Sequence, residues 1–196
     1  LFLYIQSRAE KNLLQEEQRI QDLLVQASYG MNIVHDLARL LNLIIEVVVK
    51  TLRLSRAEIY LLNKDGSQYC LAVPESKNPG MYCFDSNDSL IQTFKQKNFP
   101  LVYDEIKMLS DMENNNGALA EIQRQMKDLS ANVVVPITVD NSLIGFLTLG
   151  ERNSKEMYSK GLLNALSVLG NQAALAIENC NYISSETKRL EAEGLK

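Results

Sequence analysis

The feature that most constrains this chain is an apolar seam near its beginning, spaced in alternating steps of four and three residues. This spacing places one stripe along one face of a helix, as in coiled coils. No proline interrupts the seam, so the sequence predicts one helix from about residue 6 to about residue 52. The eleven seam positions, ten of them apolar, are Leu13, Glu17, Ile20, Leu24, Ala27, Met31, Val34, Ala38, Leu41, Ile45 and Val48.

A helix of that length is too long to be covered by one small domain. About 45 residues at 1.5 Å each span about 68 Å, roughly twice the width of a small domain. Its first half therefore has to project from the globule. An isolated helix with an exposed apolar seam is unfavourable in water, so the sequence predicts a partner helix. We expect residues 1–32 to form a linker or coiled-coil helix ahead of the main domain.

A second seam with the same spacing lies near the end of the chain, between residues 162 and 190. Two terminal helices that each require a partner favour a symmetric homodimer. We predict that the first seam pairs at the entry and that the second pairs at the exit or against the entry helix. The predicted dimer contacts are Ile20, Leu24, Ala27, Met31, Leu162, Leu166, Leu169, Ala173, Ala176, Cys180 and Ile183.

Between the two seams the apolar residues change to a period of two, which is typical of strands. The turn residues Asn63–Gly66 and Asp140–Asn141 predict two hairpins. Together these segments predict an α+β fold with a central antiparallel sheet flanked by the terminal helices. The expected elements are strands over 57–62, 68–73, 100–103, 133–139 and 143–149, helices over 89–97 and 118–129, a loop or irregular edge over 74–86, and a polar turn over 104–117. We expect Asp85, Ser86 or Asn87 to cap the helix over 89–97.

Composition excludes several classes of function. The 196 residues carry a formal net charge of -4, whereas nucleic-acid binding needs a basic surface. The chain has one His and three Cys, with no CxxC pair, so we expect no metal site and no cofactor. An odd number of scattered cysteines fits a reducing compartment such as the cytoplasm better than a disulfide scaffold.

No apolar run approaches the ~20 residues of a membrane-spanning helix, so the segment itself is expected to be soluble. The apolar start Leu1–Ile5 reads either as the first turn of the long helix or as the end of a membrane helix that lies upstream. In the second case the full-length protein would be anchored in the inner membrane.

Several stretches resemble the GAF domains of bacterial sensor histidine kinases. The most specific are Val133–Ile137, Asp140–Gly150 and Asn171–Asn179, the last reading Asn-Gln-Ala-Ala-Leu-Ala-Ile-Glu-Asn. Ala57–Leu62 followed by Asp65-Gly66 resembles the first strand and turn of the same domain. The resemblance covers residues 33–183, which leaves 184–196 as the start of a C-terminal signalling helix.

The resemblance implies a sheet of five to six antiparallel strands, with the long terminal helices packed on one face and a small-molecule pocket on the other. On that second face we predict the pocket residues Tyr69, Tyr82, Phe84, Tyr103 and Asp104, with residues 111–117 as a lid. In such kinases the exit helix continues into the helices of the kinase core. The implied function is a non-catalytic sensory domain that dimerises and relays a small-molecule or upstream signal.

Two alternatives within the same fold stay open at this point. A thiol oxidoreductase similar to methionine sulfoxide reductases would need Cys70 and Cys83 poised together in the pocket. A GAF regulator of a cyclase or a transcription factor would differ only in the output that follows the exit helix. Cys180 is either a small apolar residue of the exit seam or, under oxidation, a cross-link between protomers.

His35-Asp36-Leu37 superficially resembles the phospho-accepting box of histidine kinases, but the expected proline is absent. Nothing in the chain resembles an ATP-binding lid. We therefore interpret His35 as a surface residue of the helix. Its position on a terminal helix also makes it a poor axial ligand for haem.

Overall fold

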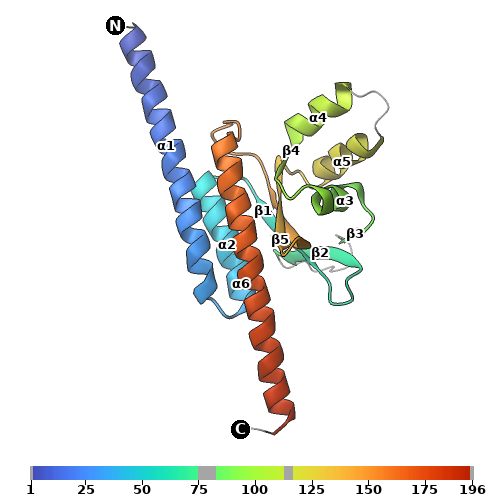
Figure 1. The fold of residues 1–196 in the computed structure, drawn as a ribbon. Coiled ribbons are helices and arrows are strands. Elements are labelled where there is room, and N and C mark those ends of the chain that lie inside the picture. Colours follow the sequence, from blue (N-terminus) through green and yellow to red (C-terminus); the bar gives the residue numbers. More distant parts are fainter. Residues whose placement is uncertain (1, 75–82, 113–116, 195–196) are drawn as a thin grey trace.

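The computed structural model describes residues 2–74, 83–112 and 117–194, and side chains from Leu14 onward within these ranges. Figure 1 shows four layers: α1, then α2 with α6, then the sheet, then the short helices α3, α4 and α5. The elements are α1 (Phe2–Gly30), the 3-10 helix η1 (Met31–Ile33), α2 (Leu37–Leu52), β1 (Ala57–Leu62), β2 (Gln68–Val73), β3 (Cys83–Asp85), α3 (Ser89–Gln96), β4 (Leu101–Val102), α4 (Tyr103–Met112), α5 (Gly117–Asp128), β5 (Val133–Val139), β6 (Ser142–Leu149) and α6 (Lys160–Ala192).

The sheet has six strands in the order β3-β2-β1-β6-β5-β4, and every neighbouring pair is antiparallel. This confirms the predicted α+β class and the predicted strand count. The β5–β6 hairpin turns at Asp140 and Asn141, both with positive φ, which is the backbone of a type I′ turn. Because β5 is buried on both faces, its run of apolar residues is explained by helices on each side of the sheet.

The predicted single helix over residues 6–52 is wrong, because the chain breaks between α1 and α2. Gly30 ends α1, η1 follows, and Asp36 starts α2 by accepting a hydrogen bond from the Arg39 backbone N–H at 2.8 Å. An aspartate at this position satisfies an N–H group that a helix start leaves unpaired. The cap also gives Asp36 a structural role within His35-Asp36-Leu37, in which His35 is exposed. The apolar spacing continues across the break because both helices pack against α6.

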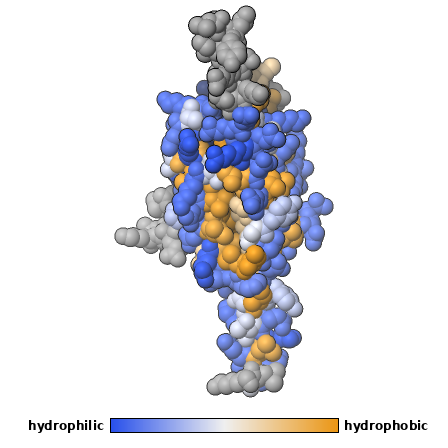
Figure 2. All heavy atoms as spheres, turned by 90° about the vertical axis from the view of Figure 1, so that its left-hand side faces the viewer, coloured by the Kyte–Doolittle hydropathy of each residue, from blue (hydrophilic) through white to orange (hydrophobic). Residues whose placement is uncertain are grey.

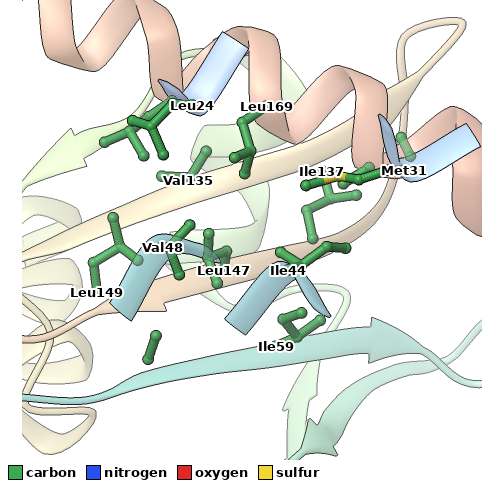
Figure 3. Close-up of a cluster of buried hydrophobic side chains, with 14 of the residues drawn as sticks. Leu24, Met31, Ile44, Val48, Ile59, Val135, Ile137, Leu147, Leu149 and Leu169 are labelled. Carbon is green, nitrogen blue, oxygen red and sulfur yellow. The ribbon is translucent and has the colours of Figure 1, made fainter. Parts of the chain in front are cut away.

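The main core lies between the sheet and the long helices (Figure 3). Leu24 from α1 and Met31 from η1 meet Leu169 from α6 above the β5 residues Val135 and Ile137, and all five are essentially inaccessible to solvent. Ile44 and Val48 of α2 cover the neighbouring strands β1 and β6. The terminal helices therefore pack on one face of the sheet, as predicted.

Most of the predicted dimer contacts belong to this core and not to a free surface. Their side chains join α1, α2 and α6 within one chain, which is the intrachain pairing left open for the exit seam. We therefore correct their assignment to a dimer interface: Leu24, Met31, Leu162, Leu166, Leu169, Ala173, Ala176 and Cys180 are 0–2% exposed. Ile20 and Ala27 are half-buried, and Ile183 is 38% exposed.

Two further local predictions need correction. Residues 103–112 form α4, whereas a polar turn was expected; Ile106 is buried and the acidic pair Asp104 and Glu105 lies in the first turn, where it complements the helix dipole. The residue that precedes α3 is Asp88, not Asp85, Ser86 or Asn87. The Asp88 carboxylate accepts from the Asp85 backbone N–H at 2.8 Å, so it fastens the loop and not the helix.

The two long helices run in the same direction and overlap side by side (Figure 1). The start of α1 extends beyond one end of the domain, and the end of α6 extends beyond the other. Within the described residues, no helix combines the length and apolarity that crossing a membrane requires.

Candidate functional site

The face of the sheet opposite the long helices carries a cluster of aromatic rings, which we call the aromatic layer. Phe146 of β6 lies at its centre and stacks on Tyr60 of β1 at 4.8 Å between ring centroids. Phe84 of β3 meets both rings edge-on, at 5.7 Å from Tyr60 and 5.6 Å from Phe146. Tyr69 of β2 and Phe94 of α3 complete the contacts at 6.3 and 6.4 Å from Phe146. Ring contacts of this kind add to the stability gained from burial.

The predicted pocket residues divide among three locations. Tyr69 and Phe84 are opposite each other on β2 and β3 and belong to the aromatic layer. Tyr103 packs against the same core from the start of α4, whereas Asp104 is exposed. Tyr82 and most of the predicted lid lie outside the described residues. The face that the resemblance assigns to a ligand is thus occupied at its centre by side chains.

Tyr69 is fixed by its hydroxyl as well as by its ring. The hydroxyl donates to the Leu143 carbonyl at 3.0 Å, and burial raises the pKa of Tyr69 above its ordinary value. A buried phenol is stable when its proton has such an acceptor. Tyr69 therefore stays protonated and is held in a fixed position within the aromatic layer.

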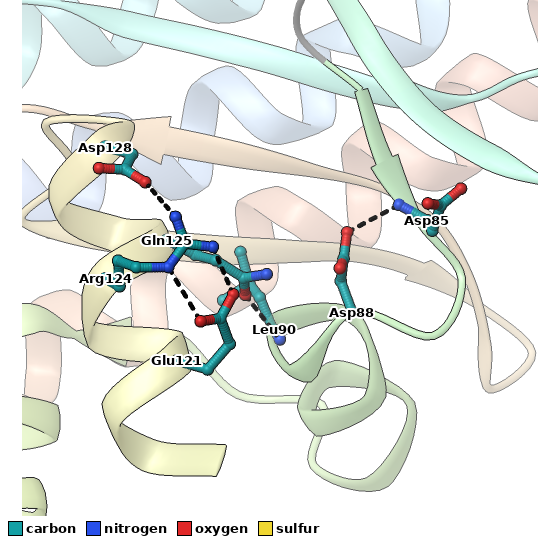
Figure 4. Close-up of polar contacts among 7 residues, drawn as sticks. All are labelled: Asp85, Asp88, Leu90, Glu121, Arg124, Gln125 and Asp128. Atoms are coloured by element: carbon teal, nitrogen blue, oxygen red, sulfur yellow. Dashed lines mark hydrogen bonds and ion pairs between the residues drawn. The ribbon is translucent and has the colours of Figure 1, made fainter. Parts of the chain in front are cut away.

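A buried glutamine joins the helices that cover this layer (Figure 4). The Gln125 side chain on α5 is 5% exposed, and its amide oxygen accepts from the Leu90 backbone N–H at 3.2 Å. Leu90 lies in the first turn of α3, where backbone N–H groups lack partners within the helix. On the outer side of α5, Arg124 pairs with Glu121 and Asp128 at 2.6 and 2.8 Å, and the first of these contacts lowers the pKa of Glu121.

Gln125→Leu is expected to destabilise the fold by about 1–3 kcal/mol, because the Leu90 N–H would be left buried without an acceptor. Denaturant unfolding measures the change in the free energy of unfolding. Gln123→Leu is the matched control on the same helix, since Gln123 is only half-buried. Equal effects of the two substitutions would contradict the role of Gln125 as an acceptor.

A shallow hollow of about 340 Å³ lies at the end of the sheet where β1 and β5 begin and β6 ends. It is the place where the predicted pocket residue Tyr103 meets open space. The hollow mixes one aromatic wall with polar and charged groups of both signs: its lining is Ser55, Arg56, Tyr103, Met126, Lys127, Ser130, Ala131, Asn132 and Glu151.

A second polar centre lies where α1 approaches the loop that leads into α6. The Arg152 guanidinium is 7% exposed and pairs with Glu156 at 2.9 Å, while it also donates to the Met157 carbonyl at 3.3 Å. The same group lies 5.8 Å from the centre of the Tyr158 ring. Together with Ile20 of α1, Arg152, Glu156 and Met157 line a groove of about 260 Å³. The helix α1 therefore contacts the loop that precedes α6.

Burial raises the pKa of Tyr158 to about 12. The folded chain keeps this proton at a pH where the unfolded chain, with an ordinary tyrosine pKa of about 10, has released it. The free energy of unfolding should therefore be unaffected below about pH 9 and should fall as the pH rises above about 10. Tyr158→Phe should make that decline less steep by up to about one proton. Urea unfolding of both proteins between pH 9 and 12 tests this, and equal slopes would contradict it.

The cysteines are arranged differently from the expectation of three reduced thiols. Cys70 and Cys83 form a disulfide between β2 and β3. Cys180 is free and buried; its thiol donates to the Val34 carbonyl at 3.2 Å, and burial raises its pKa. Because this thiol faces inward, it is not placed to cross-link two protomers. No group of three or more His, Cys, Asp or Glu side chains suited to a metal occurs in the part of the chain that the structure describes.

Comparison with known families matches residues 36–179 to the family described as GAF domain. The chain belongs to the GAF domain family. The match begins at Asp36, the cap of α2, and ends within α6, so it contains the whole sheet and both faces described above. It leaves α1 and the projecting end of α6 outside.

One curated relative of this GAF domain is a diguanylate cyclase. Diguanylate cyclase A of Treponema denticola is 26% identical over 188 residues, and the match covers 89% of this chain and 47% of that protein. The chain thus spans about half the length of this curated relative.

Two solved structures share the fold of this GAF domain. The GAF domain of a phosphoenolpyruvate-protein phosphotransferase from Acinetobacter matches with a TM-score of 0.58 and 16% identity, covering 83% of this chain and 94% of that one. The free methionine-R-sulfoxide reductase of Neisseria meningitidis matches with a TM-score of 0.58 and 14% identity, covering 84% and 91%. At these identities the two structures show the fold alone.

Proposed function

We propose that this GAF domain is a non-catalytic regulatory module that passes a signal from α1 to an output domain attached to α6. The observation that carries the proposal is the parallel packing of α1 on α6, with one helix extending from each end of the domain. Any change in the sheet or in α1 that shifts α6 is transmitted along a rigid rod to whatever follows. A ligand can drive such a shift only if it binds the two arrangements with different affinity.

We propose a diguanylate cyclase as the output. The curated relative at 26% identity is a diguanylate cyclase, and its match covers 89% of this chain, so it extends beyond the family region at residues 36–179. A sensor histidine kinase, which the sequence resemblance suggested, is the second candidate, favoured by the similarity of residues 133–179 to kinase GAF domains. The full-length protein separates the two, since a cyclase forms a cyclic dinucleotide from GTP and a kinase phosphorylates its own histidine from ATP.

The thiol-oxidoreductase alternative needs both cysteines in the pocket face, and the register of β2 argues against that placement. Successive side chains of a strand point to opposite faces. Since Tyr69 points into the aromatic layer, Cys70 points to the other face of the sheet. The disulfide therefore lies away from the rings that would form a pocket.

Insertions in α6 test the relay directly. Two residues added after Leu190 rotate the following segment by about 200°, whereas seven residues rotate it by about 700°, close to its original phase. In the full-length protein we expect the seven-residue insertion to keep output activity near that of the parent and the two-residue insertion to change it severalfold. Equal activity of all three proteins would refute a helical relay.

We further propose that the module works as a homodimer through an apolar band on its helical face. Figure 2 shows this band bordered by hydrophilic residues. It contains a groove of about 590 Å³ between α1 and α6 in which eight of the nine lining residues are uncharged. We define the outer stripe as Val25, Tyr29, Val168, Leu175 and Tyr182.

The outer stripe has the properties of a self-complementary helix interface. Val168, Leu175 and Tyr182 follow one another at intervals of seven residues on α6, which keeps them on one side of the helix. They are 36, 43 and 67% exposed. A second copy is the occupant we propose, because Asp22 is the single charge lining the groove, so a twofold axis would bring few like charges together.

Replacing both Val168 and Leu175 with Glu should weaken the dimer by about 100-fold or more, since a twofold axis places four new charges in one interface. Sedimentation equilibrium measures the dissociation constant. Met108→Glu on α4 is the control, because Met108 is 58% exposed on the opposite side of the sheet. An unchanged constant in the double variant would exclude the outer stripe as the interface.

A further inference from the structure

The edge strand β3 is attached to the sheet by few interactions. It has three residues and, among the described residues, pairs with β2 alone, through the partners Gln68 and Asp85, Tyr69 and Phe84, and Cys70 and Cys83. The Gln68 amide also donates to the Asp85 carboxylate at 2.9 Å. Because short edge strands open readily, the disulfide is the strongest link that holds β3 in place.

Phe84 connects this strand to the aromatic layer. Its neighbours in sequence are Cys83 and Asp85, and its ring meets Tyr60 and Phe146 edge-on. Alternation along the strand places the disulfide on one face of the sheet and the Phe84 ring on the other. The bond that fixes β3 therefore also holds Phe84 over the two stacked rings.

We propose that the Cys70–Cys83 disulfide is a reversible clasp that keeps the aromatic layer closed when oxidised and lets it open when reduced. Both cysteines are half-buried, so a small or protein dithiol can reach them, whereas the third cysteine is 2% exposed. The opened layer would uncover the Tyr60 and Phe146 rings on the side where Phe84 now meets them, which suits an apolar ligand. This inference does not depend on which output follows α6.

The chemistry of the clasp is a two-electron exchange with a dithiol. One thiolate of the dithiol attacks a sulfur of the Cys70–Cys83 bond, giving a mixed disulfide and one cysteine thiolate. The second thiol of the reductant then displaces the other cysteine, so the dithiol leaves as a disulfide and both cysteines end as thiols. A peroxide reverses the change: one thiolate attacks a peroxide oxygen, the O–O bond breaks with loss of hydroxide to leave a sulfenic acid, and the second cysteine displaces water from it to re-form the disulfide.

Amide hydrogen exchange of the whole chain tests the clasp. Closing a loop with a disulfide can lower the equilibrium constant for opening of the linked segment by up to about 100-fold. Reduction with dithiothreitol should therefore speed amide exchange of β3 and of Tyr69 by tenfold or more. Amides in the middle of α6 should not change. The anionic dye anilinonaphthalene sulfonate should gain fluorescence on reduction as the rings become accessible.

Thiol counts and variants decide the outcome. The oxidised chain should show one thiol when denatured and the reduced chain three; three thiols even after treatment with hydrogen peroxide would overturn the proposal. The double variant Cys70→Ser and Cys83→Ser should show the amide exchange of the reduced chain, with no change on addition of dithiothreitol. Cys180→Ser should show the same change in exchange as the parent chain. If the double variant fails to fold, the comparison of oxidised and reduced parent chains decides alone. Equal exchange of β3 in these two states would overturn the clasp.

Discussion

Leu169→Glu is expected to unfold the chain. Leu169 is fully buried between α1 and β5. The substitution removes an apolar side chain and places a carboxylate where no partner or water can reach it, at a cost of about 5 kcal/mol or more. Since a domain of this size is stable by roughly 5–15 kcal/mol, we expect most molecules to lose their structure. Circular dichroism and denaturant unfolding measure the loss.

The same substitution six residues later provides the control. Leu175 lies on the same helix but is 43% exposed, and leucine and glutamate have similar helix propensities. Leu175→Glu should therefore leave the free energy of unfolding of a single chain within about 1 kcal/mol of the parent and affect association instead. A folded Leu169→Glu chain that has merely become monomeric would restore Leu169 to the dimer interface and contradict the core described here.

Gly170→Ala should destabilise the domain by about 2–3 kcal/mol, although alanine favours a helix over glycine by about 1 kcal/mol. A Cβ atom at position 170 would lie 2.4 Å from the Pro136 carbonyl oxygen and 3.2 Å from the Val135 side chain. The first contact is with backbone, so α6 itself would have to move away from β5. Chemical denaturation measures the change, and a stabilised variant would show that α6 is not seated this closely on the sheet.

Gly161→Ala on the same helix is the control, because the atoms nearest to its new Cβ belong to a flexible side chain and not to backbone. A Cβ atom there would lie 2.6 Å from the end of the Gln21 side chain, which can rotate away. The helix preference of alanine should then prevail, giving a change between zero and about 1 kcal/mol in favour of folding. Equal destabilisation by both alanines would indicate a general effect of losing glycine instead of the close approach at Pro136.

Periodicity predicts the sheet well because each strand signal is local. Alternation over Ala57–Leu62, the turn at Asn63–Gly66 and the type I′ turn at Asp140–Asn141 together define both hairpins, which are two of the five strand pairings in the sheet. Helix 103–112 was missed because its polar first turn, Asp104-Glu105, resembles a loop. The burial of Ile106 that stabilises it depends on a core assembled from distant segments.

The long helices show what a seam alone cannot specify. Four-three spacing indicates that one side of a helix needs a partner, but the same stripe serves a second chain or another helix of the same chain. Leu24 and Leu169 pack against each other within one chain. The outer stripe beside them has the same spacing but is less apolar. The break at Gly30 and Asp36 carried a usable signal, a glycine followed by a capping aspartate.

The candidate site was harder to anticipate because it depends on pairing across the sheet. Tyr69 and Phe84 were both predicted as pocket residues and lie opposite each other. Phe146, at the centre of the layer, was not predicted, because the sequence indicated only that it lies in a buried strand. Gln125 carries no motif, since a polar residue on a helix is ordinarily exposed. The disulfide follows from the register of β2 and β3, which sequence spacing across residues 74–82 does not determine.

The molar mass of the chain in solution, measured by light scattering over a range of concentrations, shows whether two copies associate. We expect twice the 22.1 kDa of one chain, because the outer stripe of α1 and α6 pairs two copies whose helices then act together on the output. A mass of 22.1 kDa at all concentrations would contradict a dimeric relay.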